Sequence, residues 1–359
     1  LLDDATWWSA AGAPIEILVE LANRADAHPW FNMPHMANDD FVQQFASYIH
    51  SHLDSSLNAY VEYTNEAWNG SLQGGYMNDQ GVALNLHPNQ YTAGLKYYSQ
   101  RSVEVFNIWE TAFGGSERLV RILAGQMSNT WRTDQILKHN DAYLNTDAFA
   151  LNPYISGDSA ALNAATTVDD IFAEMSNTGS SLSLPATLTS LASHKSITTQ
   201  YGVDLFAYEA GQHLVDFTTS SVDEHPNPLF LAANHDSRMA DIYEQLLDGW
   251  KDSGGQLFIH YSAPRIYNHH GSWGTSEYIN QTRSEAPKYD ALLTFMENNP
   301  CWWPGCANTT GNQAPVADAQ AVNATEETAL AIVLSGSDPE DDALSYLIVT
   351  PPTHGVLTE

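Results

Sequence analysis

The sequence predicts an α/β fold in which helices cover a parallel sheet. Stretches with strand character alternate with stretches of helical periodicity between residues 14 and 298. The strands are near-continuous apolar runs, a pattern typical of parallel strands that are buried on both faces. Polar and aromatic residues suited to chemistry gather just after the ends of these runs. Together these observations favour a (β/α)8 barrel, whose functional groups lie at the carboxyl ends of the strands.

Six stretches share β-branched or aromatic residues bounded by turn residues, and each predicts a strand. They are 30–33, 59–64, 119–124, 148–151, 203–208 and 256–261.

The helices follow from apolar periodicity and end signals. Pro14 suits the first turn of an amphipathic helix over 14–27. Asn38 caps the next helix, whose predicted buried face is Phe41, Phe45, Ile49 and Leu53. Gly114 and Gly115 close a long helix over 91–113. The remaining segments are a broken helical stretch over 156–199, helices over 238–251 and 286–298, and irregular connections over 70–89 and 262–274.

Six strands do not close an eight-stranded barrel. We therefore expect the first one or two β/α units to lie upstream of Leu1, which is not an initiator Met. The alternative is an open, doubly wound sheet, but no glycine-rich phosphate-binding pattern follows any of the predicted strands. The sequence predicts a barrel domain over 1–299, a linker over 300–313 and a small C-terminal all-β, sandwich-like module over 314–359.

Composition restricts the class of ligand. Against 43 acidic residues there are 13 basic ones, which gives a net charge of −30. Such a chain has no basic stripe to neutralise phosphates, which argues against nucleic acid and anionic membranes. No apolar run reaches the roughly 20 residues of a membrane span. Ten Trp and 17 Tyr suit stacking on sugar rings. We expect a secreted, monomeric protein that handles neutral substrates.

The two cysteines are close together in the chain. Cys301 and Cys306 flank Trp-Trp-Pro-Gly, a spacing that permits a small disulfide loop in an exported protein. The surrounding sequence lacks the partners of a zinc site.

Two glutamates far apart in the chain each end a predicted strand. Glu66 follows the strand over 59–64, and Glu209 follows the strand over 203–208. With two units upstream, these strands become the fourth and seventh of eight. Carboxylates across one barrel mouth can face each other over a substrate. Cleavage of a glycoside with retention needs such a pair, roughly 5 Å apart.

The motifs Thr64-Asn-Glu-Ala-Trp68 and Ala207-Tyr-Glu-Ala-Gly211 resemble those of clan A glycoside hydrolases, which are (β/α)8 barrels. The resemblance implies that Glu66 is the acid/base, that Glu209 is the nucleophile and that Asn65 binds the substrate 2-hydroxyl. It also implies substrate-site roles for Tyr154, which would hold Glu209 ionised, and for His35. The arginine that many members carry on the second strand has no counterpart here, which leaves the activation of the nucleophile partly unexplained.

Other side chains have both a functional and a structural interpretation. Trp68, Tyr261 and Trp273 are candidates for sugar stacking, although large aromatics more often fill space in a core. His213, His269 and His270 invite a metal interpretation, but histidines in polar loops are usually solvated. We predict no metal and no cofactor for catalysis.

The tail differs from the rest in composition. Residues 312–359 resemble the cadherin-like or immunoglobulin-like repeats of large bacterial exported proteins, with strand-like runs over 330–334 and 344–349. The repeat is predicted to be cut short at Glu359. Such repeats often hold calcium through acidic turns, which here would use Asp338, Glu340, Asp341 and Asp342. A solvated acidic turn explains the same residues equally well.

These observations predict a secreted bacterial retaining glycosidase that cleaves a β-linked polysaccharide resembling cellulose, mannan or xylan. The rival is a non-catalytic carbohydrate-binding or adhesion protein on the same scaffold. A lyase acting on an acidic polysaccharide ranks last, because it needs cationic groups to neutralise uronates.

Overall fold

The computed structural model describes residues 12–71, 73–303, 306, 316–323, 325, 328–337, 344, 346, 348, 352 and 354. The chain divides into two compact units, Leu1–Trp302 and Trp303–Glu359.

Six parallel strands of the first unit form a curled sheet, half of a barrel. Each strand pairs with the next one along the chain, in the order β1-β2-β3-β4-β6-β7, and the short β5 also pairs with β6. Because the strand order never reverses, the sheet has no switch point and is not doubly wound. The strands are β1 (Trp30–Asn32), β2 (Ala59–Glu62), β3 (Leu119–Ala124), β4 (Ala148–Leu151), β5 (Tyr154–Ile155), β6 (Asp204–Gln212) and β7 (Phe258–His260).

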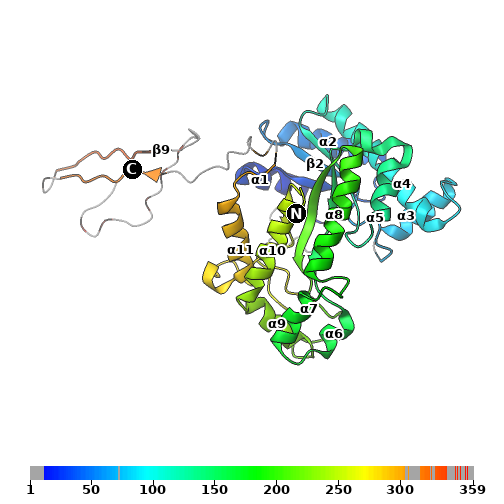
Figure 1. The fold of residues 1–359 in the computed structure, drawn as a ribbon. Coiled ribbons are helices and arrows are strands. Elements are labelled where there is room, and N and C mark those ends of the chain that lie inside the picture. Colours follow the sequence, from blue (N-terminus) through cyan, green and yellow to red (C-terminus); the bar gives the residue numbers. More distant parts are fainter. Residues whose placement is uncertain are drawn as a thin grey trace. The chain divides into compact units, whose positions relative to one another are not determined.

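Helices join successive strands and cover the sheet (Figure 1). Helix α8 packs on β6, α10 packs on α11, and α6, α7 and α9 gather at one end of the unit. The helices are α1 (Ile15–Ala25), α2 (Asp39–His52), α3 (Gly74–Ala83), α4 (Gln90–Phe113), α5 (Thr130–Lys138), α6 (Ser159–Ala164), α7 (Val168–Met175), α8 (Leu184–Tyr201), α9 (Asn227–His235), α10 (Arg238–Asp252) and α11 (Pro287–Asn298), with 3-10 turns η1 (His139–Asn145) and η2 (Arg283–Glu285).

The two faces of the sheet bury different side chains. Phe31, Val61 and Phe149 point outward into a core shared with helices such as α2 and α4. Alternate residues point inward, where Ile122 and Phe206 belong to a second, smaller cluster. Because both faces are buried, the strands are apolar throughout, which is the pattern that predicted them.

All six predicted strands are confirmed, and so are the predicted long helices. The predicted cap of α2 is also confirmed, because the Asn38 side chain accepts a hydrogen bond from the Phe41 amide at 2.9 Å. The predicted apolar face of α2 is confirmed only in part: Ile49 and Leu53 are buried and Phe45 packs against the core, but Phe41 does not belong to the buried face. Val42, Ala46 and Ile49 are its buried residues, whereas Phe41 is 45% exposed.

The connection over 70–89, predicted as irregular, contains the helix α3. Its glycines suggested a loop, but Gly81 lets α3 lie directly against α4. A Cβ atom at Gly81 would lie 2.2 Å from the carbonyl oxygen of Ala93. The close crossing of two helices explains the glycine, and sequence periodicity does not reveal it.

In the second unit, β8 (Val316–Ala317) pairs antiparallel with β9 (Gly336–Ser337). The predicted strand over 330–334 is wrong, because no residue of this run is in a strand. Within this run, the Val333 carbonyl accepts a hydrogen bond from Gln320 Nε2 at 2.9 Å. Part of the run over 344–349 lies outside the described residues, as do all the predicted calcium ligands, Asp338, Glu340, Asp341 and Asp342.

Both cysteines, Cys301 and Cys306, are disulfide-bonded. Among the described residues, no helix is both long enough and apolar enough to cross a membrane.

We predict that Gly211→Ala destabilises the first unit. Gly211, in β6, has φ +129°, and a Cβ atom there would lie 2.6 Å from Tyr243 Oη and 2.9 Å from His260 Nε2. Gly114→Ala is the control, because Gly114 also has positive φ but faces open space. We expect Gly211→Ala to cost about 1–3 kcal/mol more than the control, measured by denaturant unfolding. Equal costs in the two variants would show that the close approach is unimportant.

Candidate active site

Glu66 lies in a tight turn just after β2. Its backbone has φ 48°, a left-handed conformation that is uncommon for residues other than glycine. The Asn69 amide nitrogen donates to the Glu66 carbonyl at 2.8 Å, and Asn69 Nδ2 donates to Glu66 Oε2 at 3.0 Å. Asn69 therefore holds both the strained backbone and the carboxylate of Glu66. Strained residues that are held in this way often lie at functional sites.

The sequence predicted that Glu209 follows its strand, but the residue lies within β6. The pairing of β6 with β7 is irregular at this point: Ala207 pairs with Phe258, whereas Ala210 pairs with His260. Between these two pairs the chain advances by three residues on β6 but by only two on β7, so β6 contains one extra residue. An extra residue of this kind breaks the alternation of side chains, and such bulges commonly re-aim a side chain beside an active site.

The carboxyl groups of Glu66 and Glu209 line the same cavity and are close enough to interact with each other. Burial, followed by the interaction with Glu66, raises the pKa of Glu209 to about 8. Two carboxylates this close together cannot both be ionised at low cost, so the pair holds one proton near neutral pH.

Tyr154 lies beside this pair. It begins β5, where its backbone pairs with that of Gly211. The interaction of its hydroxyl with Glu209 lowers the pKa of that carboxyl against the larger effect of burial. Burial, with Glu209 adding to it, raises the pKa of Tyr154 itself, so the hydroxyl keeps its proton.

A cavity of about 680 Å³ opens over the two glutamates. It is within the usual size range of ligand pockets. Six of the eight predicted site residues line it, namely Glu66, Trp68, Tyr154, Glu209, Tyr261 and Trp273. The structure therefore brings together side chains from the ends of β2, β4, β6 and β7.

The other two predicted residues are not part of the cavity wall. Asn65 precedes Glu66 in the turn and is half-buried. His35 packs edge-on against Tyr76, with ring centroids 5.1 Å apart, and its carbonyl accepts a hydrogen bond from Tyr63 at 2.5 Å. The roles assigned to both residues stay predictions.

His213 also lines the cavity and was considered from the sequence only as a metal ligand. Trp273 Nε1 donates to His213 Nδ1 at 3.1 Å, so the proton of the neutral ring lies on Nε2. Burial lowers the pKa of His213 to about 4, which keeps the ring neutral. Within the described residues Nε2 has no hydrogen-bond partner, so its N–H is available to a ligand in the cavity.

Buried hydrogen bonds hold the loop that carries Trp273 in place. The Ser272 carbonyl accepts hydrogen bonds from Gln212 Nε2, at 2.7 Å, and from Lys288 Nζ. Lys288 is fully buried, also bonds Asn234 Oδ1 at 2.8 Å, and lies 4.3 Å from the centre of the Tyr267 ring. These contacts fix the loop to β6 and α11, and through it the Trp273 indole.

A third carboxyl group, Glu62, was missed in the sequence. It ends β2, four residues before Glu66, and is fully buried. Trp30 Nε1 donates to its Oε2 at 3.0 Å, while Oε1 has no partner among the described residues. Burial is the main cause that raises the pKa of Glu62 to about 8, and Glu209 and Glu66 raise it further. An acidic residue inside an otherwise apolar strand was the available signal.

The other histidines of the predicted metal alternative do not form a cluster with acids. The rings of His269 and His270 contact each other, with centroids 3.8 Å apart. Among the described residues, no three His, Cys, Asp or Glu side chains are arranged to hold a metal ion.

Comparison with known proteins gives a likeness of fold. No protein-family model and no curated protein sequence matches the chain. A solved structure of a 4-O-α-L-rhamnosyl-β-D-glucuronidase from Fusarium oxysporum matches with a TM-score of 0.50 and 12% identity, over 82% of this chain and 56% of that one. A Bacteroidetes-affiliated GH5 cellulase matches with a TM-score of 0.46 and 13% identity, over 73% of this chain and 60% of that one.

The chain spans about half to three fifths of the length of these structures. At 12% identity the likeness to the glucuronidase shows the fold alone: a parallel, curled sheet like that of a barrel glycoside hydrolase.

We predict that Glu62→Gln flattens the dependence of stability on pH. The folded chain keeps a proton on Glu62 up to a pKa of about 8, whereas the ordinary value is 4.5. Between these values the folded state binds more protons, so this group makes stability fall as pH rises. The contribution is about 5 kcal/mol at most. Unfolding of both proteins from pH 5 to 8 measures it, and parallel curves would show that Glu62 is not a buried neutral acid.

Proposed function

We propose that this protein is a secreted retaining glycoside hydrolase that cleaves a β-linked polysaccharide. Glu66 is the acid/base and Glu209 is the nucleophile. The observation that carries the proposal is that these two carboxyl groups, which come from separate strands, line one aromatic-lined cavity and interact with each other there. The disulfide-bonded cysteines are compatible with an oxidising compartment.

The reaction needs one proton on the pair and uses it in two steps. With a glycoside bound, Glu66 gives the proton to the departing oxygen as the bond from that oxygen to the anomeric carbon breaks, and a Glu209 oxygen bonds to that carbon. Glu66, now ionised, then takes a proton from a water molecule. The water oxygen attacks the anomeric carbon and releases Glu209. Two inversions give net retention.

Two neighbouring side chains fit these roles. Asn69 fixes the Glu66 carboxyl through Oε2. Tyr154 interacts with Glu209 through its hydroxyl and so favours its ionised form, which a nucleophile requires. This interaction gives part of the activation that the sequence left unexplained.

The sugar-binding surfaces are aromatic. Trp68 lines one part of the cavity, and Tyr261 and Trp273 line another. Flat rings of this kind stack on the apolar faces of pyranose rings. Asn65 is assigned to the 2-hydroxyl and His213 Nε2–H to a further sugar oxygen.

We predict that azide distinguishes the two glutamates. Glu66→Ala and Glu209→Ala should each lower kcat on polysaccharide by a factor of at least about 10³, because each removes one half of the double displacement. With an activated aryl β-glycoside, azide should rescue both variants but give opposite products. Glu209→Ala should form the α-glycosyl azide by one inversion, and Glu66→Ala the β-glycosyl azide by two.

Product analysis by NMR reads out the configuration, and thermal unfolding checks that both variants are folded. Full activity in either variant contradicts its assignment. Glycan binding by the wild-type chain without release of reducing ends would favour the carbohydrate-binding alternative.

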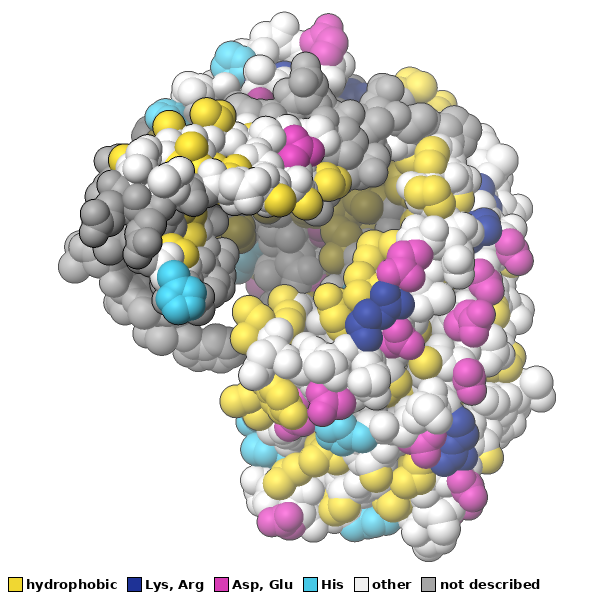
Figure 2. All heavy atoms as spheres, turned by 90° about the vertical axis from the view of Figure 1, so that its left-hand side faces the viewer, with side chains coloured by type: hydrophobic (Ala, Val, Ile, Leu, Met, Phe, Trp, Pro, Cys, Tyr) yellow, Lys and Arg dark blue, Asp and Glu magenta, His cyan; other side chains and the backbone are white. Residues whose placement is uncertain are grey.

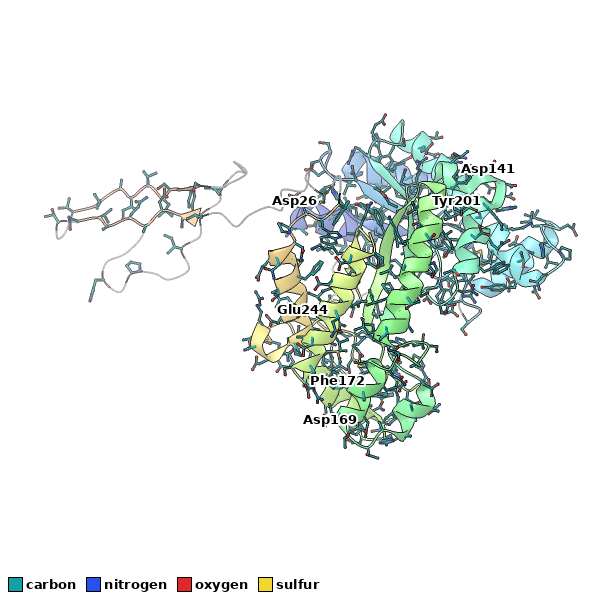
Figure 3. All side chains as sticks on the ribbon, viewed as in Figure 1. Asp26, Asp141, Asp169, Phe172, Tyr201 and Glu244 are labelled. Carbon is teal, nitrogen blue, oxygen red and sulfur yellow. The ribbon has the colours of Figure 1, made fainter. Side chains whose placement is uncertain are left out.

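We predict that Tyr154→Phe moves the acid limb of the kcat/KM pH profile upward by about one unit. The lost interaction stabilised ionised Glu209, so its pKa rises further and the nucleophile ionises only at higher pH. Tyr201→Phe is the matched control: Tyr201, labelled in Figure 3, donates to a different carboxylate, Asp134, at 2.8 Å. An unmoved limb in Tyr154→Phe would remove Tyr154 from the mechanism.

A further inference from the structure

Most arginines of this acidic chain are neutralised by acids. All eight lie among the described residues, and five of them form ion pairs with Asp or Glu side chains. On the face drawn in Figure 2, the Lys and Arg side chains lie next to acidic ones. The paired arginines are Arg24, Arg101, Arg121, Arg238 and Arg283.

The other three arginines have no ion pair among the described residues, and they differ in which groups contact the guanidinium instead. Arg118 donates to the main-chain carbonyls of Leu53, Asp54 and Leu57, which satisfy its guanidinium. Arg132 and Arg265 have neither an acid nor such a set of carbonyls among the described residues. Both lie instead behind aromatic side chains that line the cavity, Trp68 and Trp273, and are not themselves among the lining residues.

Arg132 is placed beside the part of the cavity formed after β2 and β3. Its guanidinium lies 5.7 Å from the Trp68 ring and 5.1 Å from the Tyr91 ring. Its polar partners are the neutral side chains of Gln126 and Tyr91. Trp68 and Gln126 both line the cavity. A half-buried cation is thus held there without a counter-charge.

Arg265, which follows β7, is also surrounded by aromatic and neutral side chains. Its guanidinium lies 5.8 Å from the Trp273 ring, and Nη1 donates to the Tyr261 hydroxyl at 3.3 Å. Both of these aromatic residues line the cavity. In the sheet, β4 and β6 lie between the strands that precede the two arginines.

Arg238 shows how this chain treats a stacked arginine elsewhere. Its guanidinium lies 4.4 Å from the Phe172 ring and forms 2.7 Å ion pairs with Asp169 and Asp236. Asp169 and Phe172 are three residues apart on α7, a spacing that places them on one face of the helix (Figure 3). Stacking therefore does not itself exclude an acid partner. Arg118 also lies over a ring, 5.8 Å from that of Phe113, without an acid, but main-chain carbonyls satisfy it. Among the described residues, only the two arginines at the cavity have neither an acid nor such carbonyls.

The catalytic pair does not supply the missing negative charge. Among the described residues, no ion pair joins Arg132 or Arg265 to these glutamates. A buried or half-buried guanidinium without a counter-charge is costly unless a ligand completes it. Most of the five N–H donors of each guanidinium are unused, in a fork that matches a carboxylate.

We propose that the substrate is an acidic glycan, and that Arg132 and Arg265 bind carboxylates of its uronic acid residues. The inference rests on the proposed glycan-cleaving function and names the chemical class of its substrate. Stacking on Trp68 and Trp273 would hold each guanidinium beside the sugar that the same ring contacts. Discrimination between acidic and neutral glycans would come from the two ends of the cavity and not from the protein's net charge.

The test measures binding, so it does not depend on hydrolysis. The full chain with Glu209→Gln is titrated by calorimetry with oligosaccharides of glucuronoxylan, polymannuronate and hyaluronan. Each is compared with the same oligosaccharide after reduction of its carboxylates to alcohols. We expect at least one acidic ligand to bind tenfold or more tightly than its reduced form. Arg132→Gln and Arg265→Gln should each reduce that preference several-fold, with the Lys variants intermediate.

Arg24→Gln is the control for net charge, because Arg24 forms an exposed pair with Glu20. It should leave the preference unchanged. The proposal is overturned if no acidic ligand binds more tightly than its reduced form, including the case of no binding, or if the preference survives in the double Arg132→Gln/Arg265→Gln variant. If the chain prefers sulfated galactan oligosaccharides and none of the uronic acid ligands, the arginines bind sulfate esters, and the carboxylate assignment is rejected. Acidic binding by a chain that releases no reducing ends would reject the hydrolase but keep this inference.

Discussion

The structure depends most on holding two acidic side chains close together inside a protein that carries many negative charges. Glu66 and Glu209 are half-buried and interact with each other at the cavity, and Glu62 lies buried close by. Such a cluster costs free energy unless protons neutralise part of it. The folded core has to offset that cost, and the extensive apolar packing on both faces of the sheet is the available source.

Several independent devices fix the geometry of that cluster. A left-handed backbone at Glu66 and its bonds to Asn69 set one carboxyl, and a bulge in β6 sets the other. Tyr154 then favours ionised Glu209. Each device comes from a different part of the chain, so the shared proton is a property of the assembled sheet and not of one motif.

Charge has to be considered locally. The net charge of −30 predicted neutral substrates, and the scarcity of cations placed acidic glycans last. Yet a total says nothing about position. Five arginines form ion pairs, while Arg132 and Arg265 lie beside cavity-lining rings with no acid partner in the part of the chain that the structure describes. Two well-placed cations outweigh a distant excess of acids, because screening limits the range of the latter to about 10 Å at ordinary salt.

The sequence by itself determined the order and type of the main elements, because apolar runs and caps are local signals. It also placed Glu66 and Glu209 at one site, because parallel strands end at a common edge. The tertiary structure decided what depends on contacts between distant segments: the inward side of β2 that buries Glu62, the bulge at Glu209, the helix over 74–83 packed through Gly81, and the indole bond that sets the His213 proton. No local pattern encodes these, since each exists only when two separate parts of the chain meet.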